Sequence, residues 1–222
     1  MDIEQPLKAV IVPVTPFAQN CSVVWCTASG EGAVIDPGGD LERIRDVIEK
    51  HGIRLAKILV THGHVDHAGG VAELAQSFGV PIEGPHKDDV FWIEQIPDSG
   101  ARYGMAEARA FESDRWLGDG DTVSVGKLTL HVVHCPGHTP GHVVFHHDLA
   151  RVAFVGDVLF RGSIGRTDFP RGNHQNLIDS IRYKLWPLGD DVTFVPGHGP
   201  VSTFGEERRS NPFVSDQALA AS

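Results

Sequence analysis

A six-residue block, His62-Gly63-His64-Val65-Asp66-His67, places three imidazoles and one carboxylate beside the end of a short apolar run. That run, Ile58-Leu59-Val60, predicts a buried strand, and Gly69 and Gly70 then lead into a segment with helical spacing. We therefore expect the block to lie in a loop between a strand and a helix, where neighbouring side chains can point toward two adjacent positions. Metal-binding residue types at this density predict a metal site.

Three further candidate ligands follow predicted strands later in the chain, and we expect all of them to meet at one edge of the sheets. The full set contains five imidazoles and two carboxylates: His62, His64, Asp66, His67, His138, Asp157 and His198. This number suits two metal ions that share a carboxylate and keep positions open for water and substrate. Imidazole and carboxylate without thiolate favour Zn, with Fe or Mn as alternatives. Any one of these histidines alone is more simply explained as an ordinary surface or core residue, but the joint pattern is not.

Two series of short strands, each followed by a helix, predict an α/β fold. Strands are predicted over 9–14, 22–27, 32–35, 58–60, 122–125, 127–134, 143–146, 152–155 and 192–195. Helical spacing is present from 40 to 52, from 71 to 78 and around Leu177, Ile181 and Leu185. Residues 81–118 are the least regular part, with a helix predicted over 87–96, and could cover a site. No linker divides residues 1–222, so we expect one domain, arranged as a sandwich with helices outside two sheets.

Composition and charge limit the classes of partner. The 222 residues carry a formal net charge of −10, which disfavours nucleic-acid binding. No segment approaches the roughly 20 apolar residues of a membrane span, and Asp2 and Glu4 occupy positions where a targeting peptide is positively charged. The three cysteines are too few for a disulfide framework and are predicted to be reduced thiols. These features predict a cytoplasmic protein without a membrane partner.

The order of the motifs resembles that of the metallo-β-lactamase superfamily over nearly the whole chain. The His62 to His67 block is followed by His138, Asp157 and His198, and Asp36 in Val-Ile-Asp-Pro-Gly matches an early position of the family. The resemblance implies a four-layer αββα sandwich. It also implies one metal held by His62, His64 and His138, a second held by Asp66, His67 and His198, and a bridging role for Asp157.

Two segments narrow the resemblance to the glyoxalase II group, in particular its short single-domain bacterial hydrolases. They are residues 157–170, which contain Gly165-Arg-Thr-Asp-Phe169, and Gly197-His-Gly-Pro200. The resemblance implies hydrolysis of a glutathione thioester such as S-lactoylglutathione by a metal-bound hydroxide. A thiol with a pKa of about 8.5 can leave without being protonated. We identify no separate general acid, so Asp66 is the candidate for proton handling.

Arg166 is the candidate substrate-binding residue, because it matches a basic position that contacts glutathione in the family. Asp168 stands where a tyrosine often follows, and a surface salt bridge is the alternative explanation of Arg166. The longer members of the group carry part of the glutathione site in a helical domain after the metal core. Only 24 residues follow His198, so we expect the glutathione contacts to come from core loops or from a neighbouring subunit.

Other residues have supporting roles in this interpretation. We expect Asp36 to bind the backbone of the ligand loop, and His142 either to support a ligand by a hydrogen bond or to belong to its strand. Cys135 is interpreted as a small buried residue. The remaining histidines considered are assigned to the surface or to strand edges: His131, His134, His146, His147 and His174.

Two other functions compete with thioester hydrolysis. Persulfide dioxygenases resemble this chain in the histidine block and in the Gly165 to Phe169 segment, and would hold one iron with His62, His138 and Asp157. A non-enzymatic metal-binding module is the third alternative. The sequence leaves the native metal, the acyl group and the oligomeric state open.

Overall fold

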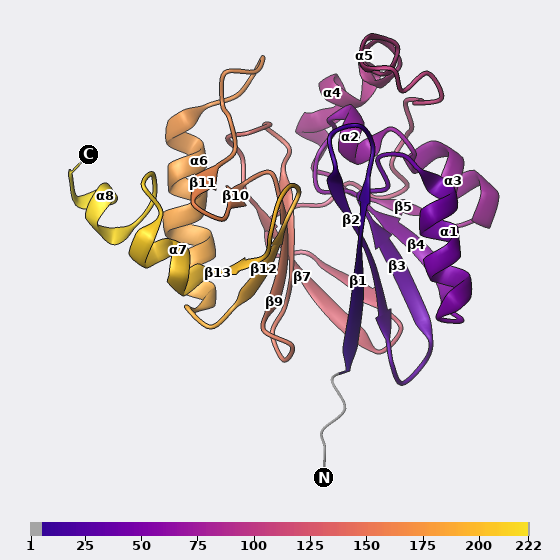
Figure 1. Cartoon of the computed structure of the whole chain (residues 1–222), viewed down its shortest axis with the longest axis horizontal. Helices are drawn as coiled ribbons and strands as arrows, with labels where there is room; N and C mark the ends of the chain where they lie inside the picture. Colours follow the sequence, from indigo (N-terminus) through magenta and orange to yellow (C-terminus); the bar gives the residue numbers. More distant parts are fainter. Residues whose placement is uncertain (1–5, 222) are drawn as a thin grey trace.

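Two large β-sheets lie at the centre of the computed structural model, which describes residues 6–221 (Figure 1). The first sheet has the order β1-β2-β3-β4-β5, with strands Leu7–Val14, Gln19–Cys26, Glu31–Ile35, Arg54–Leu59 and Ile82–Glu83. The second has the order β13-β12-β9-β8-β7-β6. Numbered from β6, its strands are Thr122–Val125, Leu128–His134, Val143–His147, Val152–Gly156, Thr193–Pro196 (β12) and Ser202–Thr203 (β13). Strands β10 (Leu159–Phe160) and β11 (Ser163–Ile164) form a separate hairpin. Asp2 and Glu4 lie outside the described residues.

Helices cover the outer faces of both sheets and the edge that carries the loops (Figure 1). They are α1 (Leu41–Lys50), α2 (Val65–Ala68), α3 (Val71–Phe78), α4 (Val90–Glu94), α5 (Ile96–Tyr103), α6 (His174–Ser180), α7 (Phe204–Ser210) and α8 (Asp216–Ala221). A 3-10 turn at Lys87–Asp89 precedes α4. A π-helical turn at Ile181–Leu185 and a 3-10 turn at Trp186–Leu188 continue α6. Each helix within residues 6–221 is too short or too polar to cross a bilayer.

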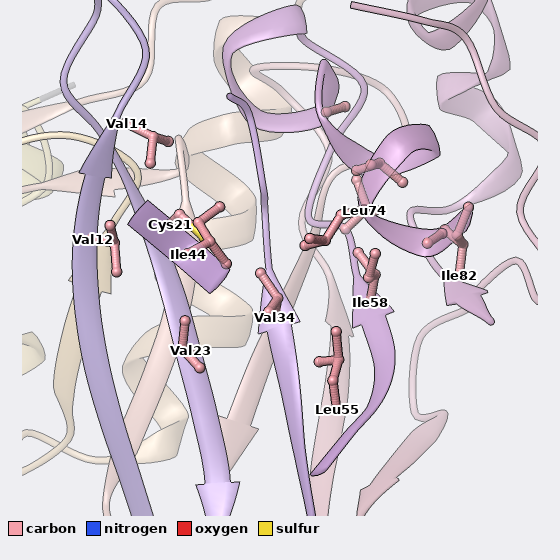
Figure 2. Packing of buried hydrophobic residues seen from close by; sticks show 14 of the residues in the cluster. Val12, Val14, Cys21, Val23, Val34, Ile44, Leu55, Ile58, Leu74 and Ile82 are labelled. Atoms are coloured by element: carbon pink, nitrogen blue, oxygen red, sulfur yellow. The ribbon is translucent and has the colours of Figure 1, made fainter. Parts of the chain in front are cut away.

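Three buried clusters show why the layers stack as they do. Alternate residues of one strand point to opposite faces, so Val23 faces α1 and α3, whereas Val24 faces the second sheet. Figure 2 shows the first cluster, in which Ile44 of α1 and Leu74 of α3 pack over the strands. The second cluster fills the space between the sheets, and the third joins the second sheet to α6 and α7. The predicted αββα sandwich is confirmed.

The predicted strand boundaries agree with the structure to within a few residues. The predicted exposure of two histidines is wrong. His146 and His147 are 2% and 5% exposed, although the sequence assigned both to the surface or a strand edge. Strand β8 lies between β7 and β9 with both faces covered, so both alternating sets of its side chains are buried. The three cysteines are buried free thiols, as expected.

The strand directions determine which loops meet. Strand β4 runs parallel to β3 and β5, whereas β7 and β9 are both antiparallel to β8, and β12 is parallel to β9. Strands β7, β9 and β12 therefore end at the same edge of the second sheet. The candidate ligands follow β4, β7, β9 and β12.

The backbone of Gly38 lies directly against the turn that carries Asp66. A Cβ atom on Gly38 would lie 1.6 Å from the Asp66 carbonyl oxygen. We expect Gly38→Ala to lower the free energy of unfolding by about 1–3 kcal/mol, because backbone must shift to admit the methyl group. Urea unfolding followed by circular dichroism measures this change.

Gly118→Ala is the matched control, because the nearest atom to its added Cβ is a side-chain oxygen 3.8 Å away. Its stability should stay within about 1 kcal/mol of the unsubstituted protein. Equal unfolding curves for the two variants would contradict the close contact at Gly38.

Candidate metal centre

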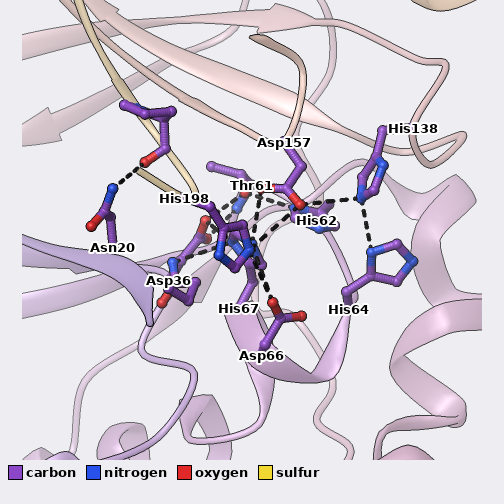
Figure 3. Close-up of polar contacts among 12 residues, drawn as sticks. Asn20, Asp36, Thr61, His62, His64, Asp66, His67, His138, Asp157 and His198 are labelled. Carbon is purple, nitrogen blue, oxygen red and sulfur yellow. Dashed lines mark hydrogen bonds and ion pairs between the residues drawn. The ribbon is translucent and has the colours of Figure 1, made fainter. Parts of the chain in front are cut away.

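The predicted ligands come together in two adjacent groups at the loop edge of the sheets (Figure 3). His62 and His64 follow β4, His138 follows β7, Asp157 follows β9 and His198 follows β12. Loops on this scaffold thus bring together side chains from positions 62 to 198, as the strand pattern predicted.

The first group contains His62, His64 and His138, and each contributes a ring nitrogen to a cluster within 4.8 Å. The closest pair is His138 Nε2 and His64 Nδ1, which are 3.0 Å apart. The His62 ring lies perpendicular to both, with centroids 4.9 and 5.0 Å away. His62 is fully buried and His138 is 2% exposed, so this group lies deep in the loop edge.

The second group contains Asp66, His67 and His198, again with one possible ligand atom each within 4.8 Å. His198 Nε2 lies 3.1 Å from Asp66 Oδ2, and His67 Nε2 lies 3.9 Å from the same oxygen. The side chains of His198 and Asp66 are 29% and 18% exposed. This group therefore borders solvent, unlike the first.

Asp157 lies between the two groups. Its Oδ2 is 3.5 Å from His138 Nε2 and 3.7 Å from His198 Nε2, while its Oδ1 is 3.2 Å from His67 Nε2. One carboxylate therefore contacts both groups, which is the geometry that a shared ligand requires.

Hydrogen bonds at the other ring nitrogen fix how four of the histidines face the site. The Nδ1 of His138 donates to the Arg166 carbonyl at 2.7 Å, and that of His198 donates to the Phe17 carbonyl at 3.2 Å. The Nδ1 of His67 donates to Asp36 Oδ2 at 2.9 Å. In this tautomer each Nε2 presents a lone pair toward the site. A hydrogen bond from the other ring nitrogen is the usual support for a metal-binding imidazole.

His62 follows the same rule through Thr61. The Thr61 hydroxyl donates to Asp36 Oδ2 at 2.6 Å and accepts from His62 Nδ1 at 3.0 Å. Its backbone N–H also donates to Asp36 Oδ1 at 2.7 Å, so the prediction that Asp36 binds the ligand loop is confirmed. Among the described residues, the buried Nε2 atoms of His62 and His67 have no hydrogen-bond partner. Inward-facing lone pairs and a central carboxylate fit a divalent cation in each group.

Charge differs between the two groups. Burial lowers the pKa of His62 well below its ordinary value, and lowers that of His64 to about 3. Burial acts in the same sense on His67, but Asp157 and Asp66 outweigh it and raise its pKa well above the ordinary value. Asp66 and Asp157 also raise the pKa of His198 against its partial burial. The carboxylates thus require a positive charge, which either a proton or a metal cation can supply.

Part of the block is helical, which corrects the prediction of a loop. Asp66 and His67 belong to α2, where the His64 carbonyl accepts from the N–H groups of His67 and Ala68 at 3.1 and 2.9 Å. A single helical turn of four residues is too short to show a 3.6-residue period in sequence. Because of this turn, the His64 side chain points in a different direction from those of Asp66 and His67. His64 therefore belongs to the first group, and Asp66 and His67 belong to the second.

Arg166 is exposed and already paired. Its guanidinium makes two hydrogen bonds of 2.7 Å to the Asp168 carboxylate and lies 4.2 Å from the centroid of the Phe169 ring. The surface ion pair considered as an alternative is therefore present. The same loop supplies the carbonyl that holds His138, so Arg166 lies beside the first group.

Further side chains surround the first group, and of these Asp89 was not predicted from the sequence. Trp92 of α4 and Phe169 pack edge-on against the His64 ring, with centroids 4.4 and 5.0 Å away. The irregular segment thus covers the first group, as its position suggested. Asp89 is a fully buried carboxylate bound to both loops of that group. His142 stacks on His62 at 4.6 Å, and its Nε2 accepts from the Asp157 N–H at 3.1 Å.

Comparisons with known proteins agree with this geometry. Residues 14–198 match the family model of the metallo-beta-lactamase superfamily, and the chain belongs to that superfamily. The chain is 46% identical over 209 residues to hydroxyacylglutathione hydrolase GloC of Haemophilus influenzae, covering 94% of this chain and 98% of the relative. It is 33% identical over 211 residues to the probable metallo-hydrolase YqgX of Bacillus subtilis, covering 94% and 98%.

Solved structures give the same fold. The B3 metallo-beta-lactamase BLEG-1 superposes with a TM-score of 0.86 at 33% identity, covering 93% of this chain and 99% of the other. TTHA1623 in a di-iron-bound form superposes with a TM-score of 0.84 at 34% identity, covering 92% and 100%.

The charge difference between the groups predicts a difference in proton release. The lowered pKa values leave the first group neutral at pH 7, so it binds metal without losing a proton, whereas the second group, with raised histidine pKa values, must release protons when an ion binds. The affinity of the second group should therefore rise with pH until the raised pKa values are passed. Zinc titration of the metal-free protein with a pH indicator measures the release.

Two variants separate the groups in this titration. His62→Ala retains the second group and should release a proton, whereas His198→Ala retains the first group and should release almost none. Equal release by the two variants would contradict the assignment of charge.

Proposed function

We propose that the protein is a metal-dependent hydrolase of glutathione thioesters, with S-lactoylglutathione as the representative substrate. His62, His64 and His138 would hold one divalent ion, and Asp66, His67 and His198 a second, with Asp157 as the shared ligand. The observation that carries this proposal is the position of Asp157, whose two oxygens lie within 3.7 Å of His67, His138 and His198.

The relatives support both parts of the proposal. The name of the GloC relative supports a glutathione thioester as substrate, and the di-iron form of TTHA1623 supports a two-metal centre. We propose zinc as the metal, because imidazole nitrogen and carboxylate oxygen are donors that zinc binds. Iron and manganese also bind such donors and are the alternatives. We propose a cytoplasmic location, since three buried free thiols accord with a reducing compartment.

Bound divalent ions would supply a water of lowered pKa and polarise the thioester carbonyl. The protein's own residues orient the reaction around them. We propose that Asp66, which borders solvent and contacts His198, takes the proton from the attacking water. Trp92 and Phe169 exclude water from the side of His64. The thiolate product needs no protonation to leave, which accords with the absence of a second acid in the proposed mechanism.

Thioester hydrolysis by metal-loaded protein is the direct test. We expect the unsubstituted protein to hydrolyse S-lactoylglutathione, and His62→Ala to lose the first metal ion together with activity, by at least about 100-fold in kcat/KM. Loss of thioester absorbance and metal analysis on the same samples provide the two readouts.

His174→Ala is the matched control, because His174 is exposed at the start of α6 and belongs to neither group. It should retain metal and activity. Undiminished turnover in His62→Ala protein that lacks the first metal ion would reject the proposed two-metal mechanism. Oxygen consumption with glutathione persulfide, in the absence of thioester hydrolysis, would instead favour the dioxygenase.

Arg166 is proposed to bind a glutathione carboxylate, which requires it to exchange its present partner, Asp168. Arg166→Ala should raise KM with little change in kcat, giving about a 10- to 150-fold loss in kcat/KM. Asp168→Asn should lower KM, because it frees the guanidinium from a competing carboxylate. Steady-state kinetics with metal content held equal measures both effects.

Unaltered KM values in both Arg166→Ala and Asp168→Asn would show that the pair is only a surface ion pair. The glutathione carboxylates would then be recognised elsewhere.

A further inference from the structure

Asp89 is a buried carboxylate with no role in the mechanism above. It lies at the junction of the 3-10 turn Lys87–Asp89 and helix α4, and its exposure is 0%. A buried carboxylate is costly unless its oxygens are hydrogen-bonded. The hydrogen-bond donors to Asp89 therefore indicate the structural role of this carboxylate.

All three donors belong to the two loops that carry the first group of histidines. The Gly63 N–H donates to Asp89 Oδ2 at 2.8 Å, and Gly63 lies between His62 and His64. The Thr139 hydroxyl, next to His138, donates to the same oxygen at 2.8 Å. The Gly141 N–H donates to Oδ1 at 2.6 Å. One carboxylate thus joins the segments that supply every histidine of the first group.

The segment around Asp89 packs closely against two glycines of these loops. A Cβ on Gly63 would lie 2.8 Å from the Cβ of Trp92, and a Cβ on Gly141 would lie 2.5 Å from the Asp89 backbone nitrogen. The His86 N–H also donates to the Gly141 carbonyl at 3.0 Å. The segment around Asp89 therefore holds both loops by backbone contact as well as by charge.

Asp36, the other buried carboxylate beside the site, contacts both groups: it reaches His62 through Thr61 and binds His67 directly. It accepts from Thr61 and from His67 Nδ1, and no hydrogen bond in the described part of the chain joins it to the loop of His138. Of these two buried carboxylates, only Asp89 joins the loop of His64 to the loop of His138.

We propose that Asp89 is a positioning residue for the first metal ion: it fixes the separation of the loops carrying His62, His64 and His138 and thereby sets the affinity of that group. The proposal rests on the metal assignment made under the proposed function. It does not depend on the substrate.

Asp89→Asn tests the proposal with minimal change of shape. An amide has one acceptor oxygen, so its NH2 must face at least one of the N–H or O–H donors that the carboxylate accepted. We expect the dissociation constant of the first metal ion to rise by about 10- to 100-fold, the usual effect of losing a group that orients a ligand. The second ion should bind as before. Competition with a chromophoric zinc chelator measures both constants.

Asp88→Asn is the matched control, because this neighbouring carboxylate is exposed and contacts His86 Nδ1, 3.4 Å away, outside both groups. It should leave both dissociation constants unchanged. Thr139→Val removes one of the three hydrogen bonds while keeping the charge, and should produce a smaller loss at the same site. It also provides a second test if Asp89→Asn folds poorly.

The effect of Asp89→Asn on metal affinity should be present only when the first group is intact. In a His62→Ala background, adding Asp89→Asn should leave the affinity for the remaining ion unchanged, which general destabilisation would not do. Equal weakening of both ions, or unchanged affinity in Asp89→Asn and Thr139→Val, would overturn the proposal. Failure of the unsubstituted protein to hydrolyse thioesters would reject the proposed function alone, because the Asp89 measurement uses metal affinity only.

Discussion

The site depends on the contacts of the Asp157 carboxylate with three imidazoles from different segments, those of His67, His138 and His198. Burial would raise the pKa of this carboxyl group, but His67 and His138 hold it well below its usual range. A charge this deeply buried is stable only where cations and donors surround it. The sandwich supplies these groups by ending β4, β7, β9 and β12 at one edge. The α2 turn then directs His67 toward Asp157 while His64 faces His138.

Oxygen acceptors around the site fix the orientation of the candidate ligands. Asp36 holds Thr61 and His67, Asp89 joins the loops on either side of the first group, and backbone carbonyls hold His138 and His198. These acceptors select the tautomer in which Nε2 faces inward. Such supporting contacts orient ligands before a metal binds, which reduces the reorganisation that binding requires.

Much of this arrangement could be predicted because the relevant signals are local. Apolar runs placed the strands, and each candidate ligand followed a run closely, so their convergence followed from the topology. The helical turn at Asp66 and His67 could not be predicted, because four residues show no period. Asp89 was missed since its partners lie 26, 50 and 52 residues away and its place in a polar segment gave no sign of burial. The pairing of Arg166 with Asp168 was one of two sequence alternatives, and only tertiary structure showed that the pair forms.

We propose that two metal ions bind, one on either side of Asp157. Anomalous X-ray diffraction from crystals of zinc-loaded protein tests it most directly. We expect two peaks, one among His62, His64 and His138 and one among Asp66, His67 and His198, with Asp157 between them. A single peak bound by His62, His138 and Asp157 would contradict it.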